Sequence, residues 1–213
     1  MGQNVYRDKM IPVLPTTYFG SIAYFKEVAK HEKVYIEAKE HFPKQSYRNR
    51  CDILGADGIL TLSIPTKKHS GSKTPTDEVL LSVDENWQKR HWRSIMSAYQ
   101  SAAFFDYYSI EVHEILFSEE TNFLKFNMNI SQRILNWLDI STELILTNSF
   151  QPVIENDPRS LLTDKNLNQD LLPGPYIQVF PSDESFTMNL SILDAVMCEG
   201  PLARNLIKDS IKA

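Results

Sequence analysis

Residues 10–36 read MIPVLPTTYFGSIAYFKEVAKHEKVYI, and this stretch decides how the chain folds. The apolar run from Met10 to Leu14, ended by Pro15, predicts a short buried strand. Residues 20–31 place their apolar side chains on one face of a helix. Val34 to Ile36 is β-branched and aromatic, which predicts a second strand. A strand, a helix and a strand in close succession favour an α/β fold with parallel pairing.

Strand and turn signals continue after this unit. Residues 55–58, Gly-Ala-Asp-Gly, have the composition of a tight turn. Apolar and polar residues alternate from Leu60 to Ile64, which predicts a strand with one buried face that ends at Pro65. Val79 to Val83 predicts a further strand.

The middle of the chain is predicted to be helical. Asn86 is placed to cap a helix whose apolar face includes Trp92, Ile95, Met96 and Tyr99. Residues 104–117 predict a second helix, and the spacing of apolar residues over 123–138 predicts a long amphipathic third one.

The last third of the chain mixes loops with short elements. Leu144 to Leu146 and Tyr176 to Phe180 each predict a strand, and residues 155–175 predict a surface loop. Ser191 with Asp194 forms a capping signature before an apolar helix, which Gly200 is expected to end. We therefore expect a single domain over residues 1–213, with a mixed, partly parallel sheet flanked by helices and a helical middle segment.

Composition and charge indicate a globular protein and argue against one kind of partner. The 213 residues are 42% hydrophobic and 23% charged, which is typical of a soluble globular protein. The net charge of −5 is uneven, because residues 1–75 hold 12 basic and 7 acidic side chains, and residues 76–213 hold 10 and 20. An acidic total argues against a nucleic-acid partner, while the basic part suits an anionic small molecule. The asymmetry is also compatible with chance variation on a solvated surface.

Familiar catalytic and cofactor motifs are absent from the sequence. There is no G-x-G-x-x-G or Walker A loop, no H-E-x-x-H or C-x-x-C pair, and no G-x-S-x-G elbow. The sequence therefore predicts no metal site and identifies no cofactor. Residues 1–9 lack a secretory signal, and no apolar run is long enough to span a membrane. With Cys51 and Cys198 expected to be free thiols, we expect a cytoplasmic protein.

The stretch from Glu37 to Arg50 is rich in groups that bind anions. Lys44, Arg48 and Arg50 are suited to hold phosphate or carboxylate oxygens. Asn49 offers an amide for orientation, and Tyr47 offers a flat surface for a base or a sugar. Glu37 is a candidate for proton transfer. The alternative is a solvated polar connection in which the carboxylates pair with neighbouring lysines.

A second cluster contains Trp87, His91 and Trp92. Trp87 and His91 are spaced to lie on one side of a helix. They predict a stacking surface with a titratable group beside it, able to move a proton near neutral pH. The alternative is an aromatic edge packed on the sheet.

These residues resemble the WbqC-like family over nearly the whole chain. The most specific part is the run from Lys44 to Arg50, K-Q-S-Y-R-N-R. Residues 60–65, 87–92, 99–108 and 190–201 follow in the order expected of that family. The resemblance implies a bacterial cytoplasmic protein associated with surface-polysaccharide biosynthesis.

Two departures from the family pattern bear on activity. The resemblance implies an opening H-Q-P-x-Y-L-P-W-like stretch, where this chain has Leu14 to Tyr18 without the His and Gln. It also implies an Asp-Asp pair after the second strand, where this chain has Ala38 and Lys39. If those groups carry chemistry in relatives, this protein either binds the ligand without turning it over or uses other residues.

Two functions follow as hypotheses. The first is a group-transferring enzyme that binds a nucleotide-sugar or a phosphorylated metabolite, with His91 or Glu37 moving a proton and Trp87 or Tyr47 stacking. The second is a non-catalytic binding or assembly protein, in which Asn49 and Arg50 bond backbone carbonyls and Trp87 is core. The oligomeric state is not indicated by the sequence.

Overall fold

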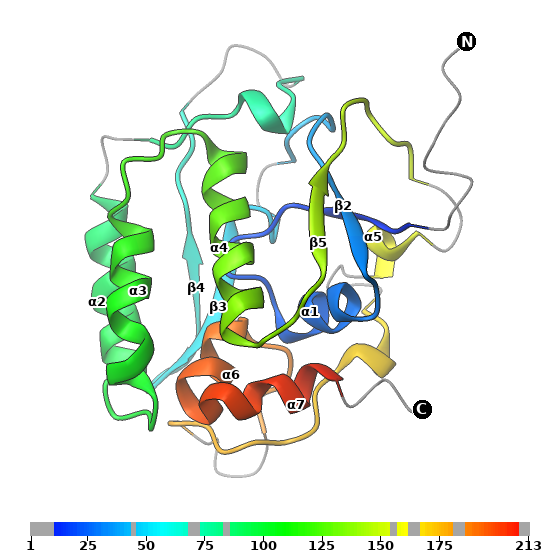
Figure 1. Cartoon of the computed structure of the whole chain (residues 1–213). Coiled ribbons are helices and arrows are strands. Elements are labelled where there is room, and N and C mark those ends of the chain that lie inside the picture. Colours follow the sequence, from blue (N-terminus) through cyan, green and yellow to red (C-terminus); the bar gives the residue numbers. More distant parts are fainter. Residues whose placement is uncertain are drawn as a thin grey trace.

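A computed structural model gives the fold of most of the chain (Figure 1). The residues that the structure describes are 11–43, 46–67, 73–82, 86–153, 157–161, 167–180 and 186–208.

A three-stranded parallel sheet lies at the centre, with the strand order β1-β2-β5. The strands are β1 (Val13–Pro15), β2 (Lys33–Glu37) and β5 (Glu143–Leu146). Helix α1 (Ile22–Ala29) connects β1 to β2, and the Ser21 side chain caps it by accepting from the Tyr24 backbone N–H. The predicted strand–helix–strand unit is therefore confirmed, with Met10 outside the described residues.

A separate hairpin pairs β3 (Arg50–Gly55) with β4 (Gly58–Ser63) in antiparallel register. The turn predicted at residues 55–58 is confirmed, with the turn itself at 56–57, and β3 is a strand that the sequence did not predict. The prediction of one buried face on β4 was wrong at Leu60, which is 43% exposed.

The helical middle segment is confirmed. It consists of α2 (Trp87–Tyr99), α3 (Phe105–Leu116) and α4 (Phe123–Trp137). The predicted side-chain cap at Asn86 was wrong, because this residue takes a left-handed conformation with φ 43° and its side chain caps nothing. Its backbone makes the turn into α2 instead.

Two predicted strands are not formed. Residues 79–82 follow a 3₁₀ turn, η1 (Thr76–Glu78), and make only isolated bridges through Leu80 and Leu81, while Val83 lies outside the described residues. Residues 176–180 form no strand. Side-chain bonds hold this segment instead, because Tyr176 OH donates to the Asp194 carboxylate at 2.6 Å.

The C-terminal part is a series of short elements. They are α5 (Pro158–Leu161), η2 (Gln169–Leu171), α6 (Ile192–Glu199), η3 (Gly200–Leu202) and α7 (Ala203–Lys208). The Ser191 cap is confirmed, with its hydroxyl accepting from the Leu193 backbone N–H. Gly200 ends α6 at φ +57°, where an added Cβ would collide with the Phe104 ring.

One cluster of buried apolar side chains joins both sheets to the helices. The α/β class is confirmed, and the parallel and antiparallel strands lie in two separate sheets. Assignment of residues 1–213 to a single domain stays a prediction. Among the described helices, none combines the length and apolar composition needed to cross a bilayer.

Candidate functional site

The three strands pair in parallel, so their carboxyl ends lie at the same edge of the sheet; β2 and β5 run toward the top of Figure 1. In α/β folds this edge is where loops gather to bind ligands. Two groups of polar residues follow it here. One surrounds Glu37 at the end of β2, and the other is the turn formed by residues 46–50.

Glu37 is fully buried, and both of its carboxylate oxygens have hydrogen-bond donors. Its Oε1 accepts from the Lys39 backbone N–H at 2.8 Å and from the Thr147 hydroxyl at 2.9 Å. Its Oε2 accepts from the Gln151 backbone N–H at 2.7 Å. The carboxylate therefore ties the end of β2 to the loop that follows β5.

Arg159 completes this buried network. Its Nη1 lies 3.7 Å from Glu37 Oε2 and donates to the Gln151 carbonyl at 2.8 Å. Its Nε and Nη2 donate to the carboxylate of Asp157 at 2.9 and 2.6 Å. A buried charge that is paired and hydrogen-bonded in this way is stable in place, and it is costly to unpair.

We call residues 46–50 the anchored turn, because donors from other elements fix its backbone. The Tyr47 carbonyl accepts from the Tyr18 backbone N–H at 3.3 Å and from the Thr17 hydroxyl at 3.0 Å. Both donors lie within three residues of the end of β1. The turn is thereby joined to the carboxyl end of the edge strand.

Two asparagines anchor the same turn from the other side. Asn127, fully buried on α4, donates its amide N–H to the Arg48 carbonyl at 2.8 Å. Asn49 donates its side-chain amide N–H to the Ile64 backbone carbonyl at 3.2 Å, while the backbone carbonyl of Asn49 accepts from the Ile64 backbone N–H at 2.7 Å. The turn is therefore held by the end of β1, by α4 and by the segment after β4.

The charged and aromatic side chains of the anchored turn are only partly buried. Arg48 makes a two-pronged pair with Glu40, with Nη2 to Oε2 at 2.8 Å. The Arg50 guanidinium lies 5.3 Å from the Tyr47 ring centroid, and Tyr47 OH donates to Asp52 at 3.3 Å. Lys44, the remaining predicted basic residue, lies outside the described residues.

His91 and Trp87 lie inside the protein next to this turn. His91 Nδ1 is 2.8 Å from Tyr18 OH, and its ring is 5.3 Å from that of Trp87. Trp87 is buried and donates its Nε1–H to the Ser82 carbonyl at 3.1 Å. Burial lowers the pKa of His91 to about 4, and the hydrogen bond to the Ser63 backbone opposes this only in part. The ring is therefore neutral at physiological pH.

The structure thus separates the predicted site residues into three places. Tyr47, Arg48, Asn49 and Arg50 share the anchored turn, with Asn49 facing the backbone of the segment after β4. His91 and Trp87 form the buried layer beside it, and Tyr18 links this layer to the turn. Glu37 belongs to the buried network with Arg159.

Sequence reasoning missed two residues that organise these places, Asn127 and Arg159. Asn127 had a signal, because it falls at helical spacing between the apolar residues Phe123, Ile130 and Ile134 and is therefore placed on a buried face. Arg159 had none, since its partners are brought to it by the fold of a loop.

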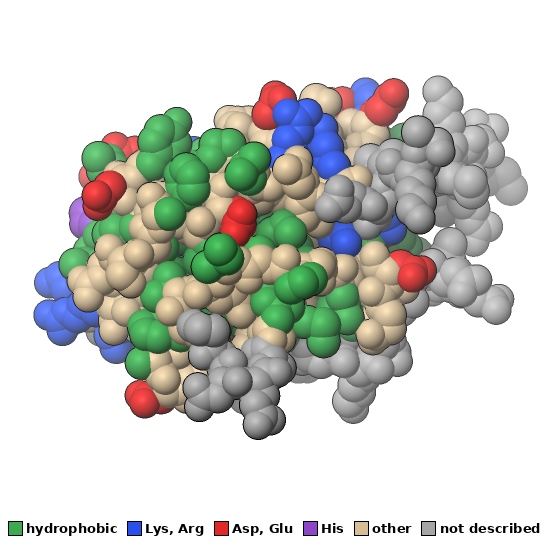
Figure 2. All heavy atoms as spheres, turned by 90° about the horizontal axis from the view of Figure 1, so that it is seen from below, with side chains coloured by type: hydrophobic (Ala, Val, Ile, Leu, Met, Phe, Trp, Pro, Cys, Tyr) green, Lys and Arg blue, Asp and Glu red, His purple; other side chains and the backbone are tan. Residues whose placement is uncertain are grey.

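The described residues offer no cluster of three or more His, Cys, Asp and Glu side chains arranged to hold a metal ion. Figure 2 shows one face of the molecule, where hydrophobic side chains gather over the middle and basic ones lie toward the margins. Among the described side chains on this face, Lys and Arg do not form a continuous stripe.

Comparison with known proteins places the chain in a family. Residues 16–172 match the WbqC-like protein family, so the chain belongs to it. The uncharacterized protein Rv1507c of Mycobacterium tuberculosis is 26% identical over 137 residues. That alignment covers 64% of this chain and 59% of the relative, so the chain spans about three fifths of the length of the curated relative it matches. No solved structure matches the chain significantly.

Proposed function

We propose that this member of the WbqC-like protein family binds an anionic small molecule at the anchored turn, of the nucleotide-sugar or phosphorylated-metabolite class. Arg48 and Arg50 hold the anionic oxygens, and Tyr47 provides the stacking surface. Lys44, which precedes the turn in sequence, adds a further positive charge. The reaction assigned to this site is group transfer in the metabolism of surface-polysaccharide precursors.

The observation that carries the proposal is how the turn is built. Its backbone is fixed by Tyr18, Thr17 and Asn127, all of which are buried. A turn that only connects two strands through solvent needs no such support. Fixing the backbone while leaving cationic side chains partly exposed lowers the ordering cost of binding, because the donors are already in place.

Glu37 and His91 act as positioning residues in this proposal. Glu37 fixes the end of β2, and His91 supports Tyr18, whose backbone N–H holds the turn. Transfer then depends on alignment of the reactants and on stabilisation of charge by Arg48 and Arg50.

Binding without turnover is the second candidate. It is favoured by the bonds of Asn49 and Trp87 to the backbone carbonyls of Ile64 and Ser82, since each residue then directs a side-chain N–H group to the backbone and not to a ligand. The departures at Ala38 and Lys39 also favour it, because neither residue supplies a carboxylate. Both candidates use the same anion-binding turn.

The test is calorimetric titration of the protein with UDP-glucose, with glucose 1-phosphate and with inorganic phosphate. We expect at least one of the three to bind the wild type, and Arg50→Ala to weaken this binding about tenfold or more, since a charge-assisted hydrogen bond contributes about 1.5–3 kcal/mol. Glu40→Gln should strengthen it, because Glu40 competes with the anion for Arg48.

Glu111→Gln is the matched control. It also removes a carboxylate from a partly exposed pair, here 2.9 Å from Arg133 on α4, which keeps Glu114 at 4.0 Å. If Glu111→Gln strengthened binding as much as Glu40→Gln, the gain would reflect net charge alone. That result, or heats of zero with all three probes, would overturn the proposal.

A further inference from the structure

The rest of the protein covers one edge of the β3–β4 hairpin and leaves most of the other edge open. The outer edge of β3 is covered, since the Asp52 carbonyl accepts from the Ser191 backbone N–H at 2.8 Å. In an antiparallel pair, cross-strand residues alternate between pointing their backbone groups at each other and away. Asp52 points away from β4, so its cross-strand partner Thr61 points away from β3. By alternation, the outward residues of β4 are Ile59, Thr61 and Ser63.

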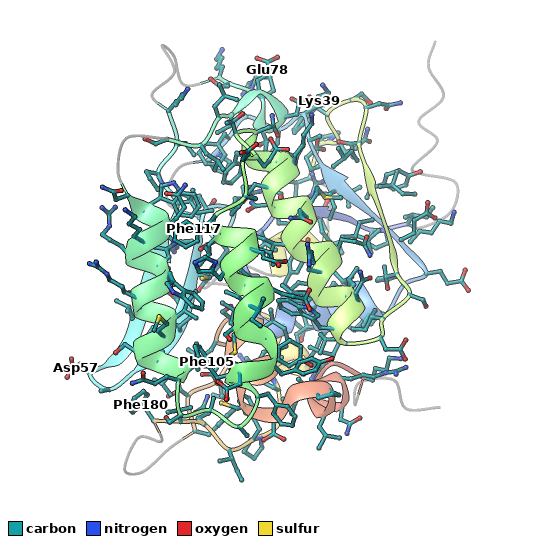
Figure 3. All side chains as sticks on the ribbon, turned by 60° about the vertical axis from the view of Figure 1, so that its left-hand side comes forward. Lys39, Asp57, Glu78, Phe105, Phe117 and Phe180 are labelled. Carbon is teal, nitrogen blue, oxygen red and sulfur yellow. The ribbon has the colours of Figure 1, made fainter. Side chains whose placement is uncertain are left out.

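The outer edge of β4 is largely open. The Ser63 backbone is engaged by the His91 ring. At Ile59 and Thr61 no hydrogen bond joins the outward backbone groups to any other segment that the structure describes. The side chains are exposed too, at 60% for Ile59 and 43% for Leu60. In Figure 3, Asp57 in the turn of the hairpin lies at the outer margin of the molecule.

Apart from the contact of His91 with Ser63 at one end, this edge lacks the features that keep edge strands from pairing. Residues 58–63 read GILTLS, without a charge or a proline. A β-bulge is also absent, because β3 and β4 pair residue by residue from Arg50 and Ser63 to Gly55 and Gly58. Such an edge is a template for another strand.

We propose that β4 pairs with β4 of a second copy of this chain in antiparallel orientation, giving a continuous four-stranded sheet across a two-fold axis. The outward backbone N–H and C=O groups of Ile59 and Thr61 determine the register of this pairing. Ile59 pairs with the partner's Thr61 and Thr61 with the partner's Ile59, which forms four backbone hydrogen bonds. Leu60 then faces the partner's Leu60 on the axis, in a pair without hydrogen bonds, and both side chains lose their exposure to water.

Charge also favours a second copy as the occupant. In this register Asp57 lies opposite the partner's Ser63. Within each chain Ser63 is next to His91 on α2, and the exposed Lys89, Arg90 and Arg93 flank that residue. The acidic tip of each hairpin is thereby brought to the basic turn of the other α2, at both ends of the paired strands. The strand itself is uncharged, so pairing with its own copy brings no repulsion.

Sedimentation velocity of the full chain over a range of concentrations tests the proposal. We expect a monomer–dimer equilibrium that Leu60→Lys weakens at least tenfold, because two ammonium groups would then meet on the axis. Ile177→Lys is the control, since Ile177 is 83% exposed and lies outside the hairpin. A wild type that stays monomeric up to about 100 µM, well above typical dissociation constants of specific dimers, would overturn it.

Cross-linking tests the register and covers the case in which Leu60→Lys fails to fold. In a Cys198→Ser background, Leu60→Cys should form an intermolecular disulfide on mild oxidation, since Cα atoms in such pairs lie about 4.5 Å apart. Ile177→Cys in the same background should not. Equal cross-linking of the two variants, or none at Leu60→Cys, would overturn the pairing. This proposal is independent of the anion-binding turn.

Discussion

Glu37 is the last residue of the central strand β2 and Glu40 follows it by three residues, yet the two carboxylates have different roles. Glu37 is fully buried, and its oxygens accept from two backbone N–H groups and a hydroxyl. The side chain of Glu40 is 13% exposed to solvent. It pairs with the side chain of Arg48, which is 18% exposed. The first carboxylate is part of the fold. The carboxylate of Glu40 pairs with Arg48, the cation that the proposed ligand would otherwise bind.

The largest effect is expected at Glu37. Glu37→Ala leaves Arg159 buried with part of its charge uncompensated and removes the acceptor of three hydrogen bonds. We expect the free energy of unfolding to fall by about 3–5 kcal/mol, measured by urea denaturation. Glu143→Ala is the control, because its pair with Lys33 is exposed and is expected to contribute less than about 1 kcal/mol. Equal losses of unfolding free energy in Glu37→Ala and Glu143→Ala would contradict a structural role specific to Glu37.

A smaller effect on stability is expected from the protonation of His91, in the buried layer beside the anchored turn. The folded pKa of His91, about 4, lies below its ordinary value of 6.5, so the unfolded chain takes up the proton first as the pH falls. Stability is therefore lost between pH 6.5 and 4. We expect a loss of about 2 kcal/mol from pH 7.5 to pH 5.

His91→Gln isolates this contribution from that of other titrating groups. Burial raises the pKa of Asp194, so the protonation of this carboxyl changes stability in the opposite direction as the pH falls. Thermal unfolding at both pH values should therefore show a smaller pH dependence in His91→Gln than in the wild type. An unchanged pH dependence would mean that His91 is accessible to protons in the folded protein.

The smallest effect on stability is expected at Glu40. Glu40→Gln breaks a partly exposed pair, so unfolding should change by less than about 1 kcal/mol, even though ligand affinity rises. Urea denaturation alongside the titration separates the two quantities. A loss as large as that of Glu37→Ala would show that the Arg48 pair is structural as well.

Local sequence signals predicted much of the fold. The cap at Ser191, the turn predicted at residues 55–58 and the spacing of apolar residues in α4 each depend on neighbours in sequence, and each was predicted correctly. The segment 176–180 has a strand-like composition but lies along α6, where Tyr176 and Gln178 bond the buried Asp194. A strand also needs a free edge to pair with, and composition does not report whether one is available.

The candidate site was predictable as a set of residue types but not as an arrangement. Arg48 and Arg50 were found because their chemistry is evident in the sequence. The burial of Glu37 and His91 was not, because it depends on Thr147, Gln151 and Tyr18, which are distant along the chain. Which polar residues face solvent is decided by such long-range contacts.

The contact between the start and the end of the chain has a consequence for how the protein is made. The Ile22 backbone N–H donates to the Leu190 carbonyl at 3.1 Å, and the Ser191 hydroxyl donates to the Phe19 carbonyl at 2.7 Å. These two hydrogen bonds at the start of α1 therefore cannot form until residues 190 and 191 have left the ribosome. During synthesis the β1–α1–β2 unit is incomplete for most of the chain's length, and closure of this contact is a late event in folding.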